Sequence, residues 1–173
     1  MRDGPAVRRL LAVCLEESGT LRELEPALQL LRGGLPGARL ALLAPLASSS
    51  PEPAEAPLSA GLAADLPQVH EFLDYPTAQD AGALLALVSE VRRRRFDAAL
   101  IFTRAGASPY LAAYVCYLAG VPLRLGQSCE FGGAVLSHRF PPEPGSGPAR
   151  MQFLALAGRA LGELEPAGPE DTG

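Results

Sequence analysis

Two carboxylates follow the first apolar run of the chain, at a place where a carboxylate could act as a general base. The run "VRRLLAVCL" covers residues 7–15, Glu16 and Glu17 come next, and "SGT" occupies residues 18–20. A positioned carboxylate can take the proton from an attacking hydroxyl group, although a solvated carboxylate in a turn is the simpler interpretation. The turn contains one glycine, which excludes both the dinucleotide-binding fingerprint and the Walker A loop. Backbone N–H groups at the start of a helix here could still bind an anion or a sugar hydroxyl.

A second polar turn, "TRAGAS" at residues 103–108, follows a later apolar run. The guanidinium of Arg104 could hold a phosphate or a carboxylate through two parallel hydrogen bonds. Thr103 and Ser108 could bind a ligand as well, or they could cap the helix that follows. This turn is therefore the second candidate for a functional site.

The cysteines and histidines do not have the spacing of a metal site. The three cysteines, Cys14, Cys116 and Cys129, and the two histidines are too scattered for zinc ligands, and the sequence has no GxSxG elbow. Cys116 falls in an apolar helical stretch and is interpreted as structural, Cys129 has no convincing histidine partner, and His70 is interpreted as an edge-strand or loop residue. We expect no metal and no cofactor. Three sparse cysteines make no disulfide framework, which favours a reduced, cytosolic setting.

The composition is that of a globular protein and argues against a nucleic-acid partner. The chain has 173 residues, 48% of them hydrophobic, and a net charge of −4, whereas nucleic-acid-binding domains are normally basic. The arginines at positions 92–95 are interpreted as the end of a surface helix, where cations complement the helix dipole, rather than as a phosphate site. No apolar run approaches the ~20 residues of a membrane span, so we predict a soluble protein.

Apolar runs and helical patterns alternate along the chain. We predict strands at residues 7–15, 38–45, 68–76, 96–102 and 121–127, a short strand or strand-like loop at 133–140, and helices at 80–95, 109–120 and 149–164. An earlier helix carries Leu21, Leu24, Leu28 and Leu31 on one face, with Pro26 as the first residue of its main part.

This alternation predicts a Rossmann-like α/β domain, with a mainly parallel sheet and helices on both faces. We expect one domain over residues 1–165, a disordered tail over 166–173, and an irregular loop over 46–61 with a helical turn near 58–65. Ligands of such sheets bind beyond the carboxyl ends of the strands. Both polar turns lie there, so these elements would position the candidate chemistry.

The order of segments resembles the N-terminal half of the family 9 glycosyltransferases, the bacterial lipopolysaccharide heptosyltransferase group. The stretch "SGTLRELEPALQLLRGGLPGARLALL" at 18–43 is similar to the family's Gly-Asp turn and "PAL…LR…PGA" helix. The stretch "RRFDAALIFTRAGASPYLAAYVCYLAGVPLRLGQ" at 94–127 matches "RFD.AL…S…A…LAG.P.RIG", and "ALAGRALG" at 155–162 resembles the closing helix. The likeness covers residues 7–163.

The resemblance implies one half of a two-domain GT-B enzyme of lipopolysaccharide biosynthesis. In that family the N-terminal domain receives the acceptor glycan, the C-terminal domain binds the nucleotide-sugar, and a carboxylate deprotonates the acceptor without a metal. The corresponding acceptor-side residues here are Ser18 and Gly19 in the first turn, and Thr103, Arg104 and Ser108 in the second. A bacterial, cytoplasmic location, with or without peripheral association with the inner membrane, is also implied.

Three departures from the family pattern bear on activity. Thr20 stands where the family has its proposed aspartate base, so Glu16 or Glu17 would have to replace it. The segment "GPARMQ" lacks the histidine and the acidic residue that usually introduce the closing helix. The chain is about half of a full enzyme and we expect the donor-binding domain to be absent. The alternatives are a partner chain that supplies this domain, a homodimer, or an inactive stand-alone binding or regulatory module.

Overall fold

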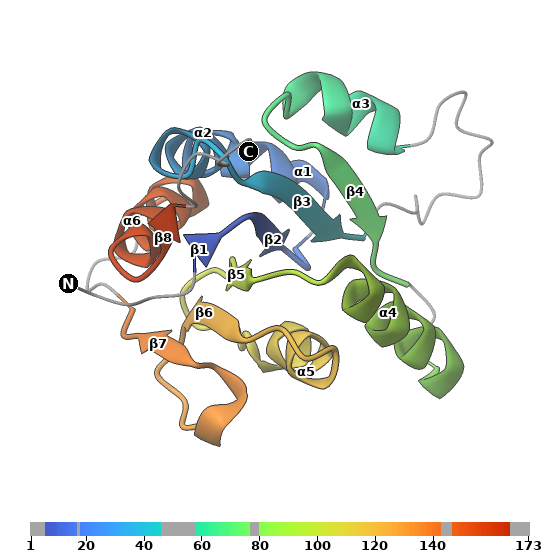
Figure 1. Ribbon diagram of the computed structural model, residues 1–173. Coiled ribbons are helices and arrows are strands. Elements are labelled where there is room, and N and C mark those ends of the chain that lie inside the picture. The colour runs from blue at the N-terminus through green and yellow to red at the C-terminus, as the bar shows by residue number, and fades with distance from the viewer. Residues whose placement is uncertain (1–5, 17, 46–57, 77–79, 143–146, 167–173) are drawn as a thin grey trace, which may run out of the picture.

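The fold is built on a parallel sheet of six strands (Figure 1). The computed structural model describes residues 6–16, 18–45, 58–76, 80–142 and 147–166. Across the sheet, the strands are β4 (Glu71–Asp74), β3 (Arg39–Ala44), β2 (Arg9–Val13), β5 (Ala98–Ile101), β6 (Leu123–Gln127) and β7 (His138–Phe140). All neighbouring strands run parallel. This order is that of Rossmann-type domains, which confirms the predicted fold class.

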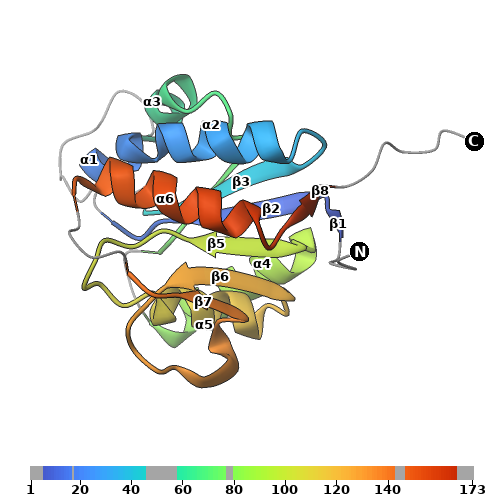
Figure 2. The same ribbon diagram turned by 90° about the vertical axis from the view of Figure 1, so that its left-hand side faces the viewer.

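Helices cover both faces of the sheet (Figures 1 and 2). One face carries α1 (Ser18–Leu21), the 3-10 helix η1 (Arg22–Leu24), α2 (Glu25–Gly34), α3 (Leu58–Asp65) and α6 (Ala149–Leu161). The other face carries α4 (Ala81–Arg94) and α5 (Tyr110–Leu118). Leu10 and Ala12 of β2 pack into the first core, and Leu11 and Val13 into the second. Because β2 is buried on both sides, its sequence is continuously apolar instead of alternating.

The leucine face predicted for residues 21–31 is buried as expected. Leu21, Leu24, Leu28 and Leu31 are each at most 1% exposed. Pro26 lies in the first turn of α2, where its missing N–H would have no partner within the helix. The shorter elements α1 and η1 precede it, so the chain turns before the main helix begins. This arrangement confirms the interpretation of Pro26.

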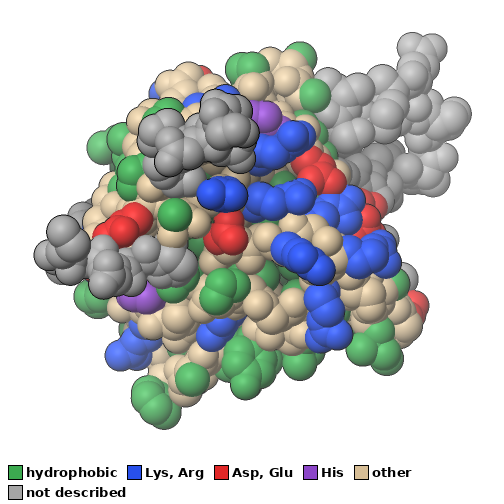
Figure 3. Space-filling view, viewed as in Figure 1, with side chains coloured by type: hydrophobic (Ala, Val, Ile, Leu, Met, Phe, Trp, Pro, Cys, Tyr) green, Lys and Arg blue, Asp and Glu red, His purple; other side chains and the backbone are tan. Residues whose placement is uncertain are grey.

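The four consecutive arginines end α4, as predicted. Asp80 caps the start of the helix, where its Oδ1 accepts a hydrogen bond of 2.8 Å from the Ala83 N–H, and Arg95 follows its last residue with a left-handed φ of 49°. Arg94 pairs with Glu90 at 2.8 Å and with Glu71, the first residue of β4. Figure 3 shows that arginines also gather in a row across the face in view, beyond this helix end.

The first predicted strand is divided in two. β1 (Ala6–Val7) pairs with β8 (Glu165–Pro166), while β2 enters the main sheet. The carboxylate of Asp97 accepts hydrogen bonds of 2.8 Å from the N–H groups of both Arg8 and Arg9, which holds the chain at this break. Pro166, expected in the tail, is therefore paired.

One loop differs in detail from the prediction, and a second agrees with it. Residues 133–140 contain the 3-10 helix η2 (Gly133–Val135) before β7. His70 precedes the edge strand β4, and its Nδ1 accepts a hydrogen bond of 3.0 Å from the Leu40 N–H, which agrees with the structural role expected for it. The predicted loop over 46–57 and the tail over 167–173 lie outside the described residues.

Among the helices of the described residues, none is both long enough and apolar enough to cross a membrane.

Candidate functional site

The two polar turns meet at the point where the strand order of the sheet reverses. β2 and β5 are neighbours, and the chain leaves them on opposite sides, toward α1 and toward α5. In Figure 2, α1 lies at the end of the molecule away from both termini. Crevices at such switch points are the usual ligand sites of open parallel sheets. The residues that the sequence singled out therefore lie where a ligand would be expected.

Arg104 joins the two turns. Its backbone N–H donates to Glu16 Oε1 at 3.3 Å, and its Nε lies 3.6 Å from Glu16 Oε2. Its guanidinium also donates a hydrogen bond to the hydroxyl of Thr20. Arg104 is 52% exposed and Glu16 is 22% exposed, so this pair is open to solvent and is worth little as a stabilising salt bridge. Its structural consequence is that one guanidinium is shared between Glu16 and Thr20.

Thr20 is not placed as a base. The residue is 3% exposed, and its hydroxyl already accepts the hydrogen bond from Arg104. A neutral hydroxyl also offers no charge with which to take a proton at neutral pH. Glu16 is the described carboxylate nearest to this position, through their common partner Arg104. Glu17 lies outside the described residues, and Ser18 and Gly19 are described only as part of α1.

A cavity of about 210 Å³ lies on the α5 side of the two turns. Glu16, Thr103 and Ser108 contribute polar atoms to its lining, and Leu111 is among its apolar residues. The Thr103 hydroxyl oxygen is buried and has no hydrogen-bond partner, whereas the Ser108 hydroxyl donates to Glu130 Oε2 at 2.8 Å. The lining therefore includes Thr103, whose enclosed hydroxyl is unsatisfied, and the acidic residue Glu16.

The alternative that Thr103 or Ser108 caps the following helix is wrong. The N-cap residue of α5 is Pro109, and no side chain caps the helix. Proline has no hydroxyl or amide to offer, so the first N–H groups of α5 receive no such bond. Ser108 is instead engaged with Glu130, and Thr103 faces the cavity.

A second hollow, of about 350 Å³, lies on the α6 side of Arg104. Glu23 and Gln152 line it. Gln152 Oε1 accepts a hydrogen bond of 2.8 Å from the Ala105 N–H, and Gln152 Nε2 donates to the Gly147 carbonyl at 2.7 Å. Gln152 thus ties α6 to the turn after β5. Sequence reasoning missed it because it lies 47 residues from Ala105 in an unremarkable helical pattern.

No group of His, Cys, Asp and Glu side chains in the described ranges could hold a metal ion.

Burial raises the pKa of the Cys14 thiol to about 12, and burial likewise raises the pKa of Cys116 to about 12. Both are therefore protonated and unreactive at neutral pH. Cys129 differs from them because it is exposed.

This difference predicts selective alkylation. With iodoacetamide at pH 8 we expect Cys129 to be modified at least ~100-fold faster than Cys14 or Cys116, because only the accessible thiolate reacts. Peptide mass spectrometry over a time course measures the three rates. Comparable rates in the folded protein would contradict the burial of Cys14 and Cys116, and urea-unfolded protein is the control in which the rates should converge.

A parallel sheet of this order, with hollows at its switch point, defines a Rossmann-like domain of the type found in GT-B glycosyltransferases. No protein-family model and no curated protein matches the sequence. Solved structures do match the fold. ADP-heptose lipopolysaccharide heptosyltransferase II of E. coli is similar over 86% of this chain and 40% of its own, with 20% identity and a TM-score of 0.66.

Two further structures share the fold. E. coli heptosyltransferase WaaC, solved with ADP-2-deoxy-2-fluoro heptose, has a TM-score of 0.65 at 14% identity, over 94% of this chain and 51% of its own. A family 9 glycosyl transferase of Veillonella parvula has a TM-score of 0.62 at 12% identity, over 94% of this chain and 43% of its own. The chain therefore has the fold of about half of such an enzyme, which confirms the predicted resemblance at the level of fold.

Proposed function

We propose that this chain provides the acceptor side of a sugar transfer from a nucleotide-sugar, as the N-terminal domain of a family 9 glycosyltransferase does. One observation carries the proposal. The two polar turns predicted from the sequence meet through Arg104 at the switch point of a fold that heptosyltransferases share. The glycan acceptor would lie over this edge of the sheet, with the unpartnered Thr103 hydroxyl among the groups that contact it.

In this proposal Glu16 takes the proton from the acceptor hydroxyl, and Arg104 positions its carboxylate. The Nε of Arg104 lies 3.6 Å from Glu16 Oε2 and its backbone N–H donates to Glu16 Oε1, so both contacts hold the carboxylate beside the turn at residues 103–108. Ser108 and the turn around residues 18–20 complete the acceptor side.

The donor half of the reaction requires a donor-binding domain in addition to this one. The chain spans 40–51% of the length of the heptosyltransferase and family 9 structures that it matches, so the proposal includes such a domain, and a second chain or a second copy of this chain is one way to supply it. Two of these structures are described with ADP or with an ADP-heptose analogue, which makes ADP-heptose the first donor to test. The proposal assigns the reaction to the cytoplasm, with the protein peripheral to the inner membrane.

A catalytically inactive binding or regulatory module is the second candidate. The observation in its favour is that Thr20 replaces the expected aspartate and is buried in a hydrogen bond. Such a module would retain the acceptor-side cleft and bind a glycan without turnover.

The test measures glycan binding first and sugar transfer second. We expect the full chain to bind a deacylated lipopolysaccharide core oligosaccharide that ends in heptose, measured by titration calorimetry, and to bind maltohexaose of similar size more weakly. ADP release from ADP-heptose is then measured after addition of a separately produced donor-binding domain of a family 9 glycosyltransferase. Release that depends on both chains supports the enzyme, binding without release supports the module, and absence of glycan binding by the folded protein contradicts both.

A further inference from the structure

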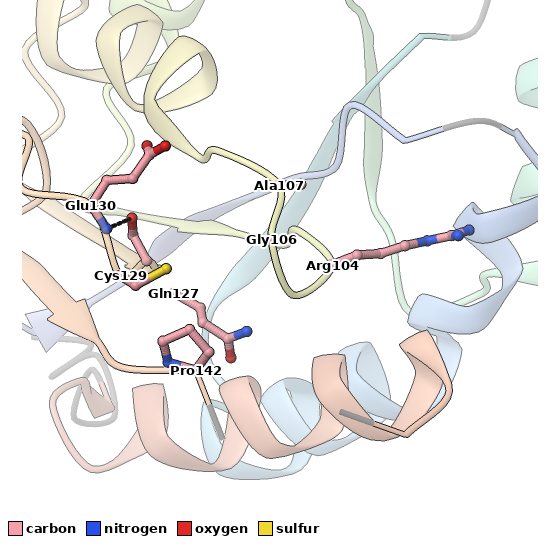
Figure 4. Close-up of a pocket in the computed structure, with 8 residues that line it drawn as sticks. Arg104, Gly106, Ala107, Gln127, Cys129, Glu130 and Pro142 are labelled. Carbon is pink, nitrogen blue, oxygen red and sulfur yellow. Dashed lines mark hydrogen bonds between the residues drawn. The ribbon is translucent and has the colours of Figure 1, made fainter. Parts of the chain in front are cut away.

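A small hollow lies between the end of β6 and the turn that follows β5 (Figure 4). Its volume is about 20 Å³, which is room for one group of the size of a water molecule. In Figure 4 the amide of Gln127 lies between Pro142 and the turn that carries Arg104 and Gly106. The Arg104 side chain extends away from it toward α1, where it meets Thr20.

Gln127 is a buried polar residue whose amide has no partner within the chain. The residue is 7% exposed, and in the part of the chain that the structure describes its side chain makes no hydrogen bond. Its amide nitrogen and oxygen are not among the enclosed polar atoms that lack a partner, so they keep contact with solvent at the hollow that the residue lines. A side-chain amide without a partner in the described chain is open to a hydrogen bond with a ligand there.

The polar groups around this amide, in contrast, are satisfied. The Ser128 hydroxyl accepts a hydrogen bond of 2.9 Å from the Glu130 N–H. The Glu130 carbonyl accepts hydrogen bonds of 2.9 Å from the Tyr110 hydroxyl and from Arg139 Nη1. The walls of the hollow are thus held in place, and the Gln127 amide is the group that remains available.

We propose that Gln127 binds a single hydroxyl group of the acceptor glycan in this hollow. An amide offers both a donor and an acceptor, and a hydroxyl group offers the same pair, so the two can form reciprocal hydrogen bonds. A carboxylate or a phosphate only accepts, so it could bond to the amide NH2 but would leave the Gln127 carbonyl oxygen without a donor. The volume admits one hydroxyl and excludes the sugar ring, which stays above the hollow. This inference rests on the proposed function and adds to it a residue that selects one hydroxylated position.

The segment that follows Glu130, a lining residue of the hollow, is also held in place, which favours selection. Arg124 of β6 donates to the Val135 carbonyl at 2.6 Å and to the Ala134 carbonyl at 3.0 Å, and its guanidinium lies over the Tyr117 ring at 5.2 Å. These contacts fix the segment that follows Glu130. A fixed site discriminates better than a mobile one, because little ordering has to accompany binding.

The test compares Gln127→Met with Gln127 in the full chain. We expect the variant to bind the heptose-ended core oligosaccharide about 10-fold more weakly, because the hydroxyl loses its partner. We also expect its melting temperature to be little changed, because the substitution breaks no side-chain hydrogen bond in the described part of the chain and keeps a side chain of similar size. Gln29→Met, at an exposed position of α2 where the described partner of the Gln29 side chain is Glu25, is the control and should change neither property. Equal affinity in Gln127→Met and in the wild type would overturn the inference.

A second measurement needs no variant. Each hydroxyl of the terminal sugar is replaced in turn by hydrogen, and binding to the wild-type chain is measured. One deoxy analogue should bind the wild-type chain about 10-fold more weakly than the parent oligosaccharide does. The Gln127→Met variant should bind this analogue and the parent oligosaccharide equally. Bound oligosaccharide should also slow alkylation of Cys129, which lines the hollow. If every deoxy analogue binds equally, the inference fails while the proposed function stands; if the wild type binds no oligosaccharide, the proposed function fails first.

Discussion

Replacement of Thr20 by aspartate is expected to leave the free energy of unfolding within about 1 kcal/mol of the wild type at pH 7, but only while Arg104 is present. Thr20 is 3% exposed and its hydroxyl already meets the guanidinium, so the introduced carboxylate would enter a charge-assisted hydrogen bond. In the double variant with Arg104→Ala, the same carboxylate would be buried without a partner. A buried, unpaired charge costs roughly 3–5 kcal/mol.

The measurement is urea denaturation of the wild type, both single variants and the double variant, combined in a double-mutant cycle. Thr20→Asn is the matched control, because it has the same shape without the charge, and its coupling to Arg104→Ala should be small. Equal stability of Thr20→Asp with and without Arg104 would contradict the contact.

The same variant bears on the proposed function. A carboxylate at position 20 would compete with Glu16 for Arg104, and it would restore the acidic residue that the family resemblance leads one to expect there. If the pair of chains transfers sugar only with Thr20→Asp, the position is a decayed base. No change in turnover would favour the binding module.

Much of the fold could be predicted from the sequence because each element carries a local signal. A strand buried on both faces has to be continuously apolar, and a helix that covers a sheet shows one apolar stripe. The candidate site was predicted only where it obeys a general rule, namely that ligands bind beyond the carboxyl ends of parallel strands. Glu16, Thr103 and Arg104 were found in this way.

The remaining site residues lack such a signal. Gln127 ends a strand and Gln152 lies in a helix, and neither type nor spacing distinguishes them from surface glutamines. Their roles depend on contacts between segments far apart in sequence, such as the bond from Ala105 to Gln152. The hydrogen bond that the Thr20 hydroxyl accepts likewise comes from Arg104, 84 residues away. Sequence periodicity predicts which elements form, but it does not predict which polar atoms end up without partners.

Replacement of Phe153 by alanine is expected to lower the free energy of unfolding by roughly 3–5 kcal/mol, because the large side chain leaves a cavity that the core fills only in part. Phe153 is 0% exposed, and its ring centroid lies 5.5 Å from that of Phe102 in an edge-to-face arrangement. Both rings are adjacent in sequence to site residues, because Thr103 follows Phe102 and Gln152 precedes Phe153. Urea denaturation measures the loss, and hydrogen exchange at the Ala105 N–H should accelerate more than the global change requires.

Met151→Ala supplies the matched control, because it removes a comparable side chain from the same helix at a position that is 59% exposed. Its effect should stay within about 0.5 kcal/mol. Phe153→Leu, which keeps most of the volume, should cost about 1–1.5 kcal/mol. A loss below 1 kcal/mol in Phe153→Ala would mean that α6 is not fastened to the sheet by this pair. The turn at residues 103–108 would then owe its position to Gln152 and to the Glu16–Arg104 contact alone.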